Sequence, residues 1–534
     1  MERWLLLVLT FLAALTSCGK KNSTLEERIR AQELHLSLSS EPPTLDPRKA
    51  VDTTSLAIIR LCFEGLMELN QAGDPIPALA ERVEVSLDQK TYTFFLKESF
   101  WSDGVQVTAN DFEHTWKTLL SPLFPCPYAS DLYVIKNAQA AKLGSCSVDE
   151  VGVVALDAKT LVVHLDHPIP YFLSLVGSRS FPAVPKHITE NNPSWAENEG
   201  PQFICNGPFQ LEGWRHNVQI DLIKNKTYWD AQKIRLEKIH LALIEDEQTN
   251  LSLFENGDLD WIGSPVSSIP LDATESLKKQ GSLEIFPVPG LYSYLFNTKQ
   301  YPFNNVHIRR ALSLAINRKA IVDNIMQNDQ IPALAMIPPS MWQHPEQYFQ
   351  DADVTKARQE LQKGLDELGT TLDQLAPLRL CYNTLSGHHK IAQAIQGQWL
   401  EALGIKVELS NKEWKVFLDE LRHHQFGIAR MGGVASYNDP MNFFELYRYL
   451  SSSDNYTQWT NPHFTELLEL SDRTSDPEKR VALLKEAEKI FMEEMPVAPI
   501  YFYTGCYLKK NYVHGAQINA IGSIDFKYAY LEMP

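Results

Sequence analysis

Helical and strand-like segments alternate through the C-terminal half of the sequence, and this alternation restricts the fold more than any other feature. Residues 389–404 (HKIAQAIQGQWLEALG) have the apolar repeat of a helix that ends at its final glycine, and the strand-like IKVELS follows at once. Residues 414–424 (WKVFLDELRHH) then predict a second helix, and FGIARM a second strand. Helices and strands in succession predict a mixed α/β body.

Apolar and polar residues alternate in several short segments elsewhere, which is typical of half-buried strands. Two helix starts are also marked. Asp476 precedes Pro477 as an N-cap does, at the start of a helix predicted over 476–494. In WSDGVQVTANDF, Thr108 and Asp111 have the spacing of a capping box. The strand-like segments are LHLSL (34–38), TYTFFL (91–96), TLVVHL (160–165), VQIDLI (218–223) and IHLALI (239–244).

The chain has 534 residues, which is too long for one hydrophobic core and predicts two to four domains. The sequence contains no internal repeat and no long low-complexity linker, so the domain boundaries are expected in short crossings. The formal net charge of −17 argues against a nucleic-acid partner, because there is no basic surplus to neutralise phosphates.

The N-terminal residues predict export. One early arginine precedes an apolar run from Leu5 to Leu15, which suits a signal-peptide core and is short for a permanent membrane span. The sequence Leu-Thr-Ser-Cys at 15–18 is similar to a bacterial lipobox, in which the cysteine is acylated and becomes the new N-terminus. Residues 1–18 are therefore predicted to be a lipoprotein signal peptide, with Cys18 as the lipidation site. The other interpretation is an ordinary signal peptide with a chance cysteine.

Six further cysteines follow Cys18, and sequence alone does not choose among their fifteen full pairings. Cys126 and Cys146 flank one segment and are the one pair considered for a disulfide, whereas Cys62 lies in an apolar run and is expected to be a buried thiol. No Cys/His grouping has zinc spacing.

Sequence motifs for catalysis are absent. There is no G-x-S-x-G, H-E-x-x-H or G-x-x-x-x-G-K segment. The adjacent histidines at 388–389 and 423–424 would point about 100° apart on a helix, so neither pair chelates a metal from one face. The sequence therefore predicts no enzyme activity, no cofactor and no metal site.

Ten segments, in this order, resemble the oligopeptide-binding proteins of bacterial peptide ABC transporters, which are members of solute-binding protein family 5. Each segment is weakly specific, and their number and order carry the resemblance from about residue 34 to about residue 510. The segments are LSSEPPTLDP (38–47), FEGLMELNQAGDPIPALAE (63–81), WSDGVQVTANDF (101–112), PYAS (127–130), AVPK (183–186), CNGPFQLEGW (205–214), NGDLDW (256–261), PFNNVHIRRAL (302–312), EWKVFLD (413–419) and YNDP (437–440).

The resemblance implies a periplasmic binding protein-like Venus flytrap, with two mixed α/β lobes and an additional α+β domain. Domain I would comprise 19–63, 189–289 and 505–534, domain II 64–188, and domain III 290–504. In this family, domains I and III close around an extended peptide. Main-chain groups of the protein pair with the peptide as an added strand would, and hydrated pockets accept varied side chains.

The resemblance also implies ligand contacts. Tyr128 and Tyr503 match tyrosines of the binding cleft. Arg430 and His388 match a pair that holds the C-terminal carboxylate of a short peptide, for which an arginine fork is well shaped. A bond to an internal carboxylate is the structural alternative for Arg430. The segment from Gly432 through Gly433, Val434 and Ala435 to Ser436 would form the rim of the cleft.

Several positions depart from the family pattern. Family members place at the position of Ser436 an aspartate that pairs with the peptide's α-ammonium. Two other acidic cleft positions correspond to Val51 and Leu295, and a bridging cysteine pair corresponds to Gly290 and Val434. The cleft is therefore expected to lack charge that would hold a cationic N-terminus, unless another acid substitutes or the ligand differs.

Asp439 is the acid nearest to Ser436 in the sequence. Because Asp439 precedes Pro440 and the apolar run MNFFELY, it is predicted to cap a helix rather than to contact the ligand.

The resemblance thus predicts a monomeric, lipid-anchored binding protein on the extracytoplasmic (periplasmic) face of a bacterial membrane, which delivers oligopeptides to an ABC permease. Alternatives within the fold are cell-wall muropeptides, peptides with a non-standard N-terminal anchor, and nickel or haem. A secreted hydrolase is the alternative from another class.

Overall fold

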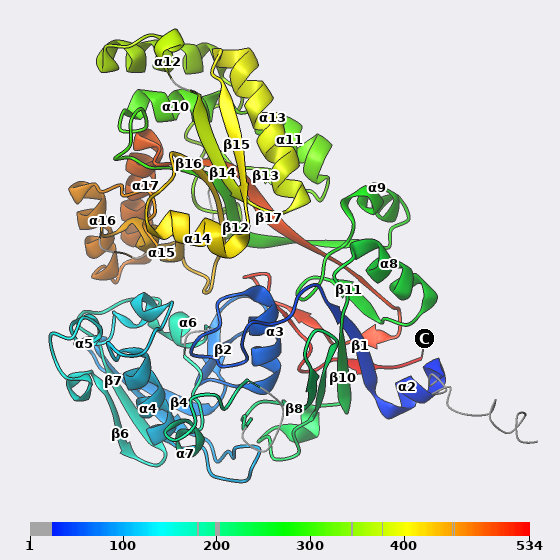
Figure 1. Ribbon diagram of the computed structural model, residues 1–534. Helices are drawn as coiled ribbons and strands as arrows, with labels where there is room; N and C mark the ends of the chain where they lie inside the picture. Colours follow the sequence, from blue (N-terminus) through cyan, green and yellow to red (C-terminus); the bar gives the residue numbers. More distant parts are fainter. Residues whose placement is uncertain are drawn as a thin grey trace, which may run out of the picture.

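The computed structural model describes residues 24–178, 181–197, 203–342, 345–375, 377–450, 452 and 454–533. The predicted signal peptide and Cys18 lie outside these ranges. Within them, no helix has both the length and the apolar character needed to cross a bilayer. Three sheets of four or more strands organise the described residues, and Figure 1 shows most strands of one of them, with its helices, above the other two.

The first sheet has the strand order β1-β10-β9-β8 and is built from two distant parts of the chain. The strands β1 and β10 are parallel, and the other two pairs are antiparallel. The alternate residues Leu34 and Leu36 of β1 are buried, as are Ile239 and Leu241 of β10, so one face of this sheet packs on the core. The strands are β1 (Glu33–Leu38), β8 (Phe209–Arg215), β9 (Gln219–Lys224) and β10 (Lys238–Leu243), with helices α2 (Leu25–Ala31), α3 (Thr53–Cys62), α8 (Glu247–Asn256) and α9 (Leu271–Lys279).

The second sheet is antiparallel, has the order β4-β5-β7-β6, and is continuous in sequence. A capping box starts α4, because Thr108 and Asp111 bond each other's backbone. This confirms the helix start predicted from WSDGVQVTANDF. The elements are β2 (Met67–Leu69), β3 (Pro75–Pro77), β4 (Ala80–Val85), β5 (Thr91–Leu96), α4 (Ala109–Leu119), α5 (Ala138–Lys142), β6 (Val153–Asp157), β7 (Thr160–His164), α6 (Phe172–Val176) and α7 (Lys186–Thr189).

The third sheet has seven strands in the order β11-β17-β12-β16-β14-β15, and β13 pairs with β17. The strands are β11 (Trp261–Gly263), β12 (Glu284–Phe296), β13 (Ile331–Pro332), β14 (Leu378–Asn383), β15 (Val407–Lys412), β16 (Ile428–Val434) and β17 (Val497–Lys509). Its helices are α10 (Val306–Leu314), α11 (Arg318–Ile321), α12 (Val354–Leu368), α13 (Ser386–Leu403), α14 (Trp414–Arg422), α15 (Met441–Phe444), α16 (Pro462–Asp472) and α17 (Pro477–Glu494). Short ribbons complete the C-terminus: β18 (Val513–His514) with β21 (Tyr530–Leu531), and β19 (Gln517–Ile518) with β20 (Ile524–Asp525).

Two 13-residue antiparallel strands, β12 and β17, run from the upper body toward the lower right of the molecule (Figure 1). Their pairing shifts register between Pro287 and Leu291. The boundaries proposed at 289/290 and 504/505 fall within these two strands. Because a bulge bends a strand and breaks its ladder, this stretch is a natural place for a bend between the bodies.

The elements expected from the sequence alternation are all present. The predicted helix at 389–404 is α13, and Gly404 ends it in the left-handed conformation that glycine adopts freely (φ 70°). Asp476 caps α17 by accepting hydrogen bonds from the backbone N–H groups of Glu478 and Lys479. Local sequence therefore sets these element ends.

All six cysteines after Cys18 are free thiols, so the bridge considered for Cys126 and Cys146 does not form in the structure. Cys62 is buried, as its apolar run predicts.

Candidate functional site

Strand β16 ends with one edge open. It pairs with β12 over its full length, from Ile428 to Val434, but with β14 only at Ile428 and Ala429. Among the described residues, no strand covers the second edge from Arg430 to Val434. An uncovered edge offers backbone N–H and C=O groups to an extended segment of another molecule.

Arg430 is at the start of this open edge, and its guanidinium lies among polar groups that are not acidic. Nη1 donates to Oδ1 of Asn383 at 3.2 Å, and Nη2 donates to the hydroxyl of Tyr503 at 3.1 Å. The guanidinium carbon lies 4.8 Å from the ring centre of Tyr292. Arg430 is 9% exposed, and its Nε atom has no hydrogen-bond partner in the described part of the chain.

No carboxylate of the described residues forms an ion pair with Arg430, although the structure contains many other ion pairs. The internal carboxylate that was the alternative for this arginine is therefore not found there. A buried guanidinium is costly unless it is paired, and its planar fork matches a carboxylate. This position is suited to an anion supplied by a ligand.

His388 lies next to Arg430. Its Nδ1 atom is 3.3 Å from the hydroxyl of Tyr292. Burial, followed by the charge of Arg430, lowers the pKa of His388 to about 3, so the imidazole is neutral at physiological pH. The neighbouring His389 instead contacts the hydroxyl of Tyr382 at 2.6 Å, so the two adjacent histidines point to different places, as expected.

Glycine at 432 is required by this packing. A Cβ atom at Gly432 would collide with the hydroxyl of Tyr503 and lie 3.1 Å from Nη2 of Arg430. A Cβ at Gly433 would meet nothing within 4 Å, so the space beside that residue is open. The pair of glycines therefore lets Tyr503 lie against the strand on one side and leaves the other side accessible.

Gly290 and Val434, which correspond to the family's bridging cysteine pair, are direct cross-strand partners on β12 and β16. A Cβ atom at Gly290 would lie 3.1 Å from Cγ2 of Val434. Two cysteines at these positions would be close enough to meet, so the geometry agrees with the correspondence. The other two positions hold apolar residues and supply no acid. Leu295 is buried in the core, and Val51 is 50% exposed.

Ser436 lies beyond the strand end, where Asn442 Oδ1 accepts a hydrogen bond from its backbone N–H. It borders a cavity of about 650 Å³ whose other walls come from α3, the β2–β3 region and the C-terminal ribbons. Of the five charged residues that line this cavity, three are acids and two are bases, which leaves one net negative charge. They are Arg60, Glu64, Glu68, Asp525 and Lys527.

The Asp439 carboxylate is bonded to other groups of the protein. It accepts two hydrogen bonds from the guanidinium of Arg480 and a third, at 2.9 Å, from the backbone N–H of Met441. Asp439 bonds the first backbone N–H of α15, as a helix cap would. The helix begins one residue later than predicted, however, so that Pro440 is the N-cap residue and Met441 the first helical residue.

Comparison with known proteins agrees with this geometry. Residues 74–457 match the family model described as bacterial extracellular solute-binding proteins, family 5. The chain belongs to this family. It is 41% identical over 543 residues to the oligopeptide-binding protein OppA of Bacillus subtilis. This alignment covers 99% of this chain and 100% of the relative.

Two solved structures give the fold. The complex of Haemophilus influenzae OppA with the peptide RPPGFSPFR superposes with a TM-score of 0.84, 30% identity, and coverage of 94% of this chain and 99% of the other. The murein tripeptide-binding protein MppA of Escherichia coli superposes with a TM-score of 0.84, 31% identity and the same coverage of both chains. The fold is therefore that of periplasmic binding proteins, with mixed α/β lobes, and the predicted fold class and family are confirmed.

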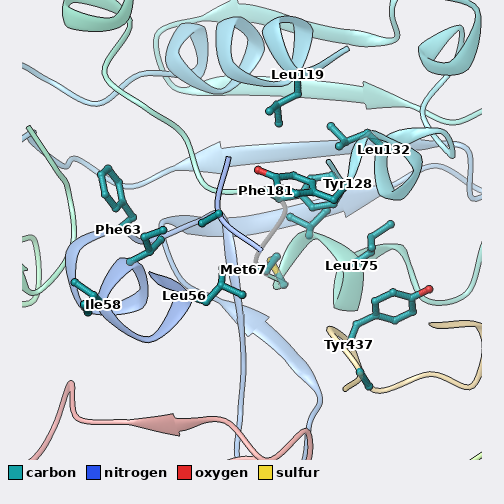
Figure 2. Packing of buried hydrophobic residues seen from close by; sticks show 14 of the residues in the cluster. Leu56, Ile58, Phe63, Met67, Leu119, Tyr128, Leu132, Leu175, Phe181 and Tyr437 are labelled. Carbon is teal, nitrogen blue, oxygen red and sulfur yellow. The ribbon is translucent and has the colours of Figure 1, made fainter. Parts of the chain in front are cut away.

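In this member of family 5, Tyr128 lies in the hydrophobic core (Figure 2). It is 5% exposed, and its hydroxyl donates to the backbone carbonyl of Pro47 at 2.5 Å. The structure thus groups Arg430, His388, Gly432 and Tyr503, whereas the described contacts of Tyr128 are made elsewhere.

Tyr437, next to Ser436, stacks on Tyr171 with 5.5 Å between ring centres and 7° between planes. This contact joins the loop after β16 to the segment that leads into α6. It holds the open strand end against the body that contains the second sheet.

We call Arg430 and the residues around its guanidinium the arginine pocket. Three residues of this pocket were not identified from the sequence: Tyr292, Asn383 and Tyr501. Tyr501 stacks on Tyr292, with 4.7 Å between ring centres. A usable signal existed, because the tyrosines of GLYSYLFN and PIYFYTG recur at every second residue and so share one face of a strand. No comparable signal marks Asn383.

Proposed function

We propose that this protein captures short peptides between its lobes and delivers them to an ABC permease, as a monomer anchored by a lipid on Cys18 to the extracytoplasmic face of a bacterial membrane. One observation carries the proposal: the buried Arg430 guanidinium, without an acidic partner in the described residues, lies at the start of an uncovered strand edge. A peptide can bind both features, because its terminal carboxylate matches the guanidinium and its backbone can extend the sheet at the uncovered edge.

The geometry sets a direction for the ligand. With its carboxylate at Arg430 and His388, an extended peptide would run along the residues from Gly432 to Ala435, toward Ser436. Its amino end would then approach the cavity that Ser436 borders. Affinity would come mainly from backbone bonds, so sequence preference would be broad. The domain assignments 19–63 with 189–289 and 505–534, 64–188, and 290–504 belong to this proposal.

The amino end is where this protein would differ from relatives that have an aspartate at the position of Ser436. The cavity offers a net negative lining in place of one dedicated carboxylate. A ligand whose amino end is modified, such as a cell-wall muropeptide, is the second candidate. It is favoured by the serine at this position and by the likeness to a murein tripeptide-binding protein.

The proposal involves no turnover. The side chains around Arg430 are tyrosines, an asparagine and a neutral histidine, which bind and orient a ligand but include no activated nucleophile. Release of an intact ligand would be consistent with this function, whereas cleavage of a bound peptide would support a secreted hydrolase.

Native mass spectrometry of the purified protein, followed by sequencing of the retained ligand, tests the proposal. We expect mixed tri- to pentapeptides, released intact. Muropeptides would identify the second candidate. A metal complex, a haem or a single non-peptide compound in the cleft would overturn peptide capture. As a direct test of orientation, the same peptides with a C-terminal amide should bind about 10- to 100-fold more weakly than the free acids, because the charged bond to Arg430 would be lost.

A further inference from the structure

A cluster of two histidines and two acids lies on the first sheet. Glu33 and His35 are alternate residues of β1, so they share one face of the strand. His240 of β10 is the direct cross-strand partner of His35, and Asp221 of β9 is the partner of His240. The four side chains form a patch on the face opposite the buried leucines of β1, and Figure 1 shows β1 and β10 side by side.

The nitrogen and oxygen atoms of this cluster converge. The ligand atoms that Glu33, His35 and His240 offer all lie within 4.8 Å of one another. The two imidazole rings pack edge to face with 4.7 Å between centres, and Nε2 of His240 is 3.9 Å from Oε2 of Glu33. In a tetrahedral zinc site with bonds of about 2.0–2.1 Å, neighbouring ligand atoms are about 3.3 Å apart. Small side-chain rotations would bring these three residues to that distance.

Both histidines are oriented by groups on their other side. Nδ1 of His240 lies 2.5 Å from Oδ1 of Asp221. The His35 imidazole lies beside the backbone of Asp258, while Nε2 of His35 is buried and has no partner in the described part of the chain. In metal sites, a carboxylate or a backbone carbonyl typically holds the second nitrogen of a ligating histidine in this manner and leaves the first with a free lone pair.

The charges around the cluster fit a divalent cation. The nearby cations have partners of their own, Asp260 for Arg28 at 3.4 Å and Glu212 for Lys238 at 2.5 Å. The carboxylates of Glu33 and Asp221 would offset the charge of the metal.

We propose that Glu33, His35 and His240 form a binding site for a divalent transition metal, best suited to Zn²⁺, on the outer face of the first sheet, with Asp221 orienting His240. Two imidazole nitrogens and one carboxylate favour zinc over Mg²⁺ and Ca²⁺, which take oxygen ligands. Glu33 and His240 are about one-third exposed, so solvent can reach the site and water can complete the coordination.

This site is separate from the arginine pocket on β16, so the metal would not be cargo of the peptide cleft. A bound ion would connect β1 with β10, two strands whose residues are about 200 positions apart in the sequence. Its effect would therefore be to stabilise the pairing of the N-terminal strand.

Titration of chelator-treated protein with ZnCl₂, read by calorimetry and by elemental analysis after desalting, tests this proposal. We expect one zinc per chain with micromolar or tighter affinity, no binding of Mg²⁺, and a tetrahedral Co²⁺ absorption spectrum. His240→Gln and His35→Asn should each weaken zinc binding at least 30-fold, and Asp221→Asn about 10-fold. Glu33→Gln provides a further ligand variant at a partly exposed position, should a histidine variant fold poorly.

Two controls separate this site from adventitious binding and from the cleft. His463→Gln removes an exposed histidine that lies near Glu466 and Glu486, and it should leave zinc affinity unchanged. Arg430→Gln should weaken peptide binding and leave zinc affinity unchanged. Millimolar affinity, or equal affinity in wild type, His35→Asn and Glu33→Gln, would overturn the metal site without affecting the proposal of peptide capture.

Discussion

Asp439 and Arg480 form a two-pronged ion pair, with Nη1 to Oδ2 at 2.8 Å and Nη2 to Oδ1 at 2.9 Å. Both side chains are only about one-eighth exposed, so the pair is largely removed from water. Asp439 is the acid nearest in sequence to Ser436, yet its two oxygens are already used by this guanidinium. The pair connects the loop after β16 to α17 and leaves the amino end of a ligand without this carboxylate.

Replacement of Asp439 by Asn should therefore affect stability and not amine recognition. Loss of the charge would leave the Arg480 guanidinium largely buried without its partner, at a cost of about 3 kcal/mol in the free energy of unfolding. Chemical denaturation measures this loss. The ratio of affinities for free-amine and N-acetylated peptides should stay at the wild-type value, and a large change in that ratio would show that Asp439 contacts the ligand.

N-acetylation of a bound peptide should cost little affinity, about threefold or less, because Ser436 offers no charge to an ammonium. In relatives that have the aspartate, the same modification should cost more. Calorimetric titration with matched peptide pairs measures both ratios. Equal, large losses in the two proteins would contradict the prediction and point to an acid of the cavity, of which Glu68 is partly exposed.

Ser436→Asp should restore the missing preference. A carboxylate at this position would gain a charged hydrogen bond to a free amine, which predicts about 10-fold tighter binding of free-amine peptides and no gain for acetylated ones. Ser436→Asn is the matched control, since it has a similar shape without the charge. Unchanged affinity in the aspartate variant would mean that the amino end of the ligand does not reach this position.

The sequence predicted local features well, because they depend on neighbouring residues. The ends of α13 and α17 follow from one glycine and one aspartate–proline pair. The resemblance identified Arg430, His388 and Tyr503, which the fold brings together from three distant segments. That Arg430 has no acidic partner among the described residues could not be predicted, because it depends on every side chain that surrounds the guanidinium.

The histidine cluster was missed for a related reason. His35 and His240 are 205 positions apart in the sequence, and parallel pairing of β1 with β10 makes them neighbours. Searches for metal-ligand spacing consider residues that are close in sequence, and in this chain they led to the adjacent pairs at 388–389 and 423–424. Only the register of the sheet shows that His35 and His240 are cross-strand partners.

Arg430→Gln should reduce the affinity for free-acid peptides about 10- to 100-fold and leave the weaker binding of C-terminal amides nearly unchanged. Because the Arg430 guanidinium lies at the start of the open edge of β16 and would bond the terminal carboxylate, its removal should affect binding of the acid only. Arg379→Gln is a matched control, because Arg379 is an exposed arginine on the neighbouring β14. Equal losses for acid and amide would mean that Arg430 supports the fold rather than the carboxylate.

Cys18→Ala should release the protein from the membrane. If Cys18 is acylated, wild-type protein should incorporate radiolabelled palmitate and sediment with membranes, and the variant should do neither. Peptide affinity of the released protein should match that of wild type, because the described binding residues lie far along the chain from position 18. Membrane association that persists in the variant would contradict lipid anchoring at this cysteine.

Acid should destabilise the protein partly through His388. The pKa of this imidazole is about 3 in the folded protein, owing to burial and then to the charge of Arg430, against an ordinary value of 6.5. Below pH 6.5 the unfolded chain therefore takes up a proton that the folded chain does not, and the free energy of unfolding falls as the pH decreases toward 3.

Between pH 7 and pH 4.5 this effect amounts to about 2 kcal/mol. In His388→Gln that part of the loss should disappear, so the difference between wild-type and variant denaturation curves should change by this amount over the same pH range. A saturating free-acid peptide should also reduce the pH dependence, because its carboxylate would favour the protonated imidazole, whereas its amide should not. Parallel curves for wild type and variant would show that His388 does not titrate differently in the folded and unfolded chains.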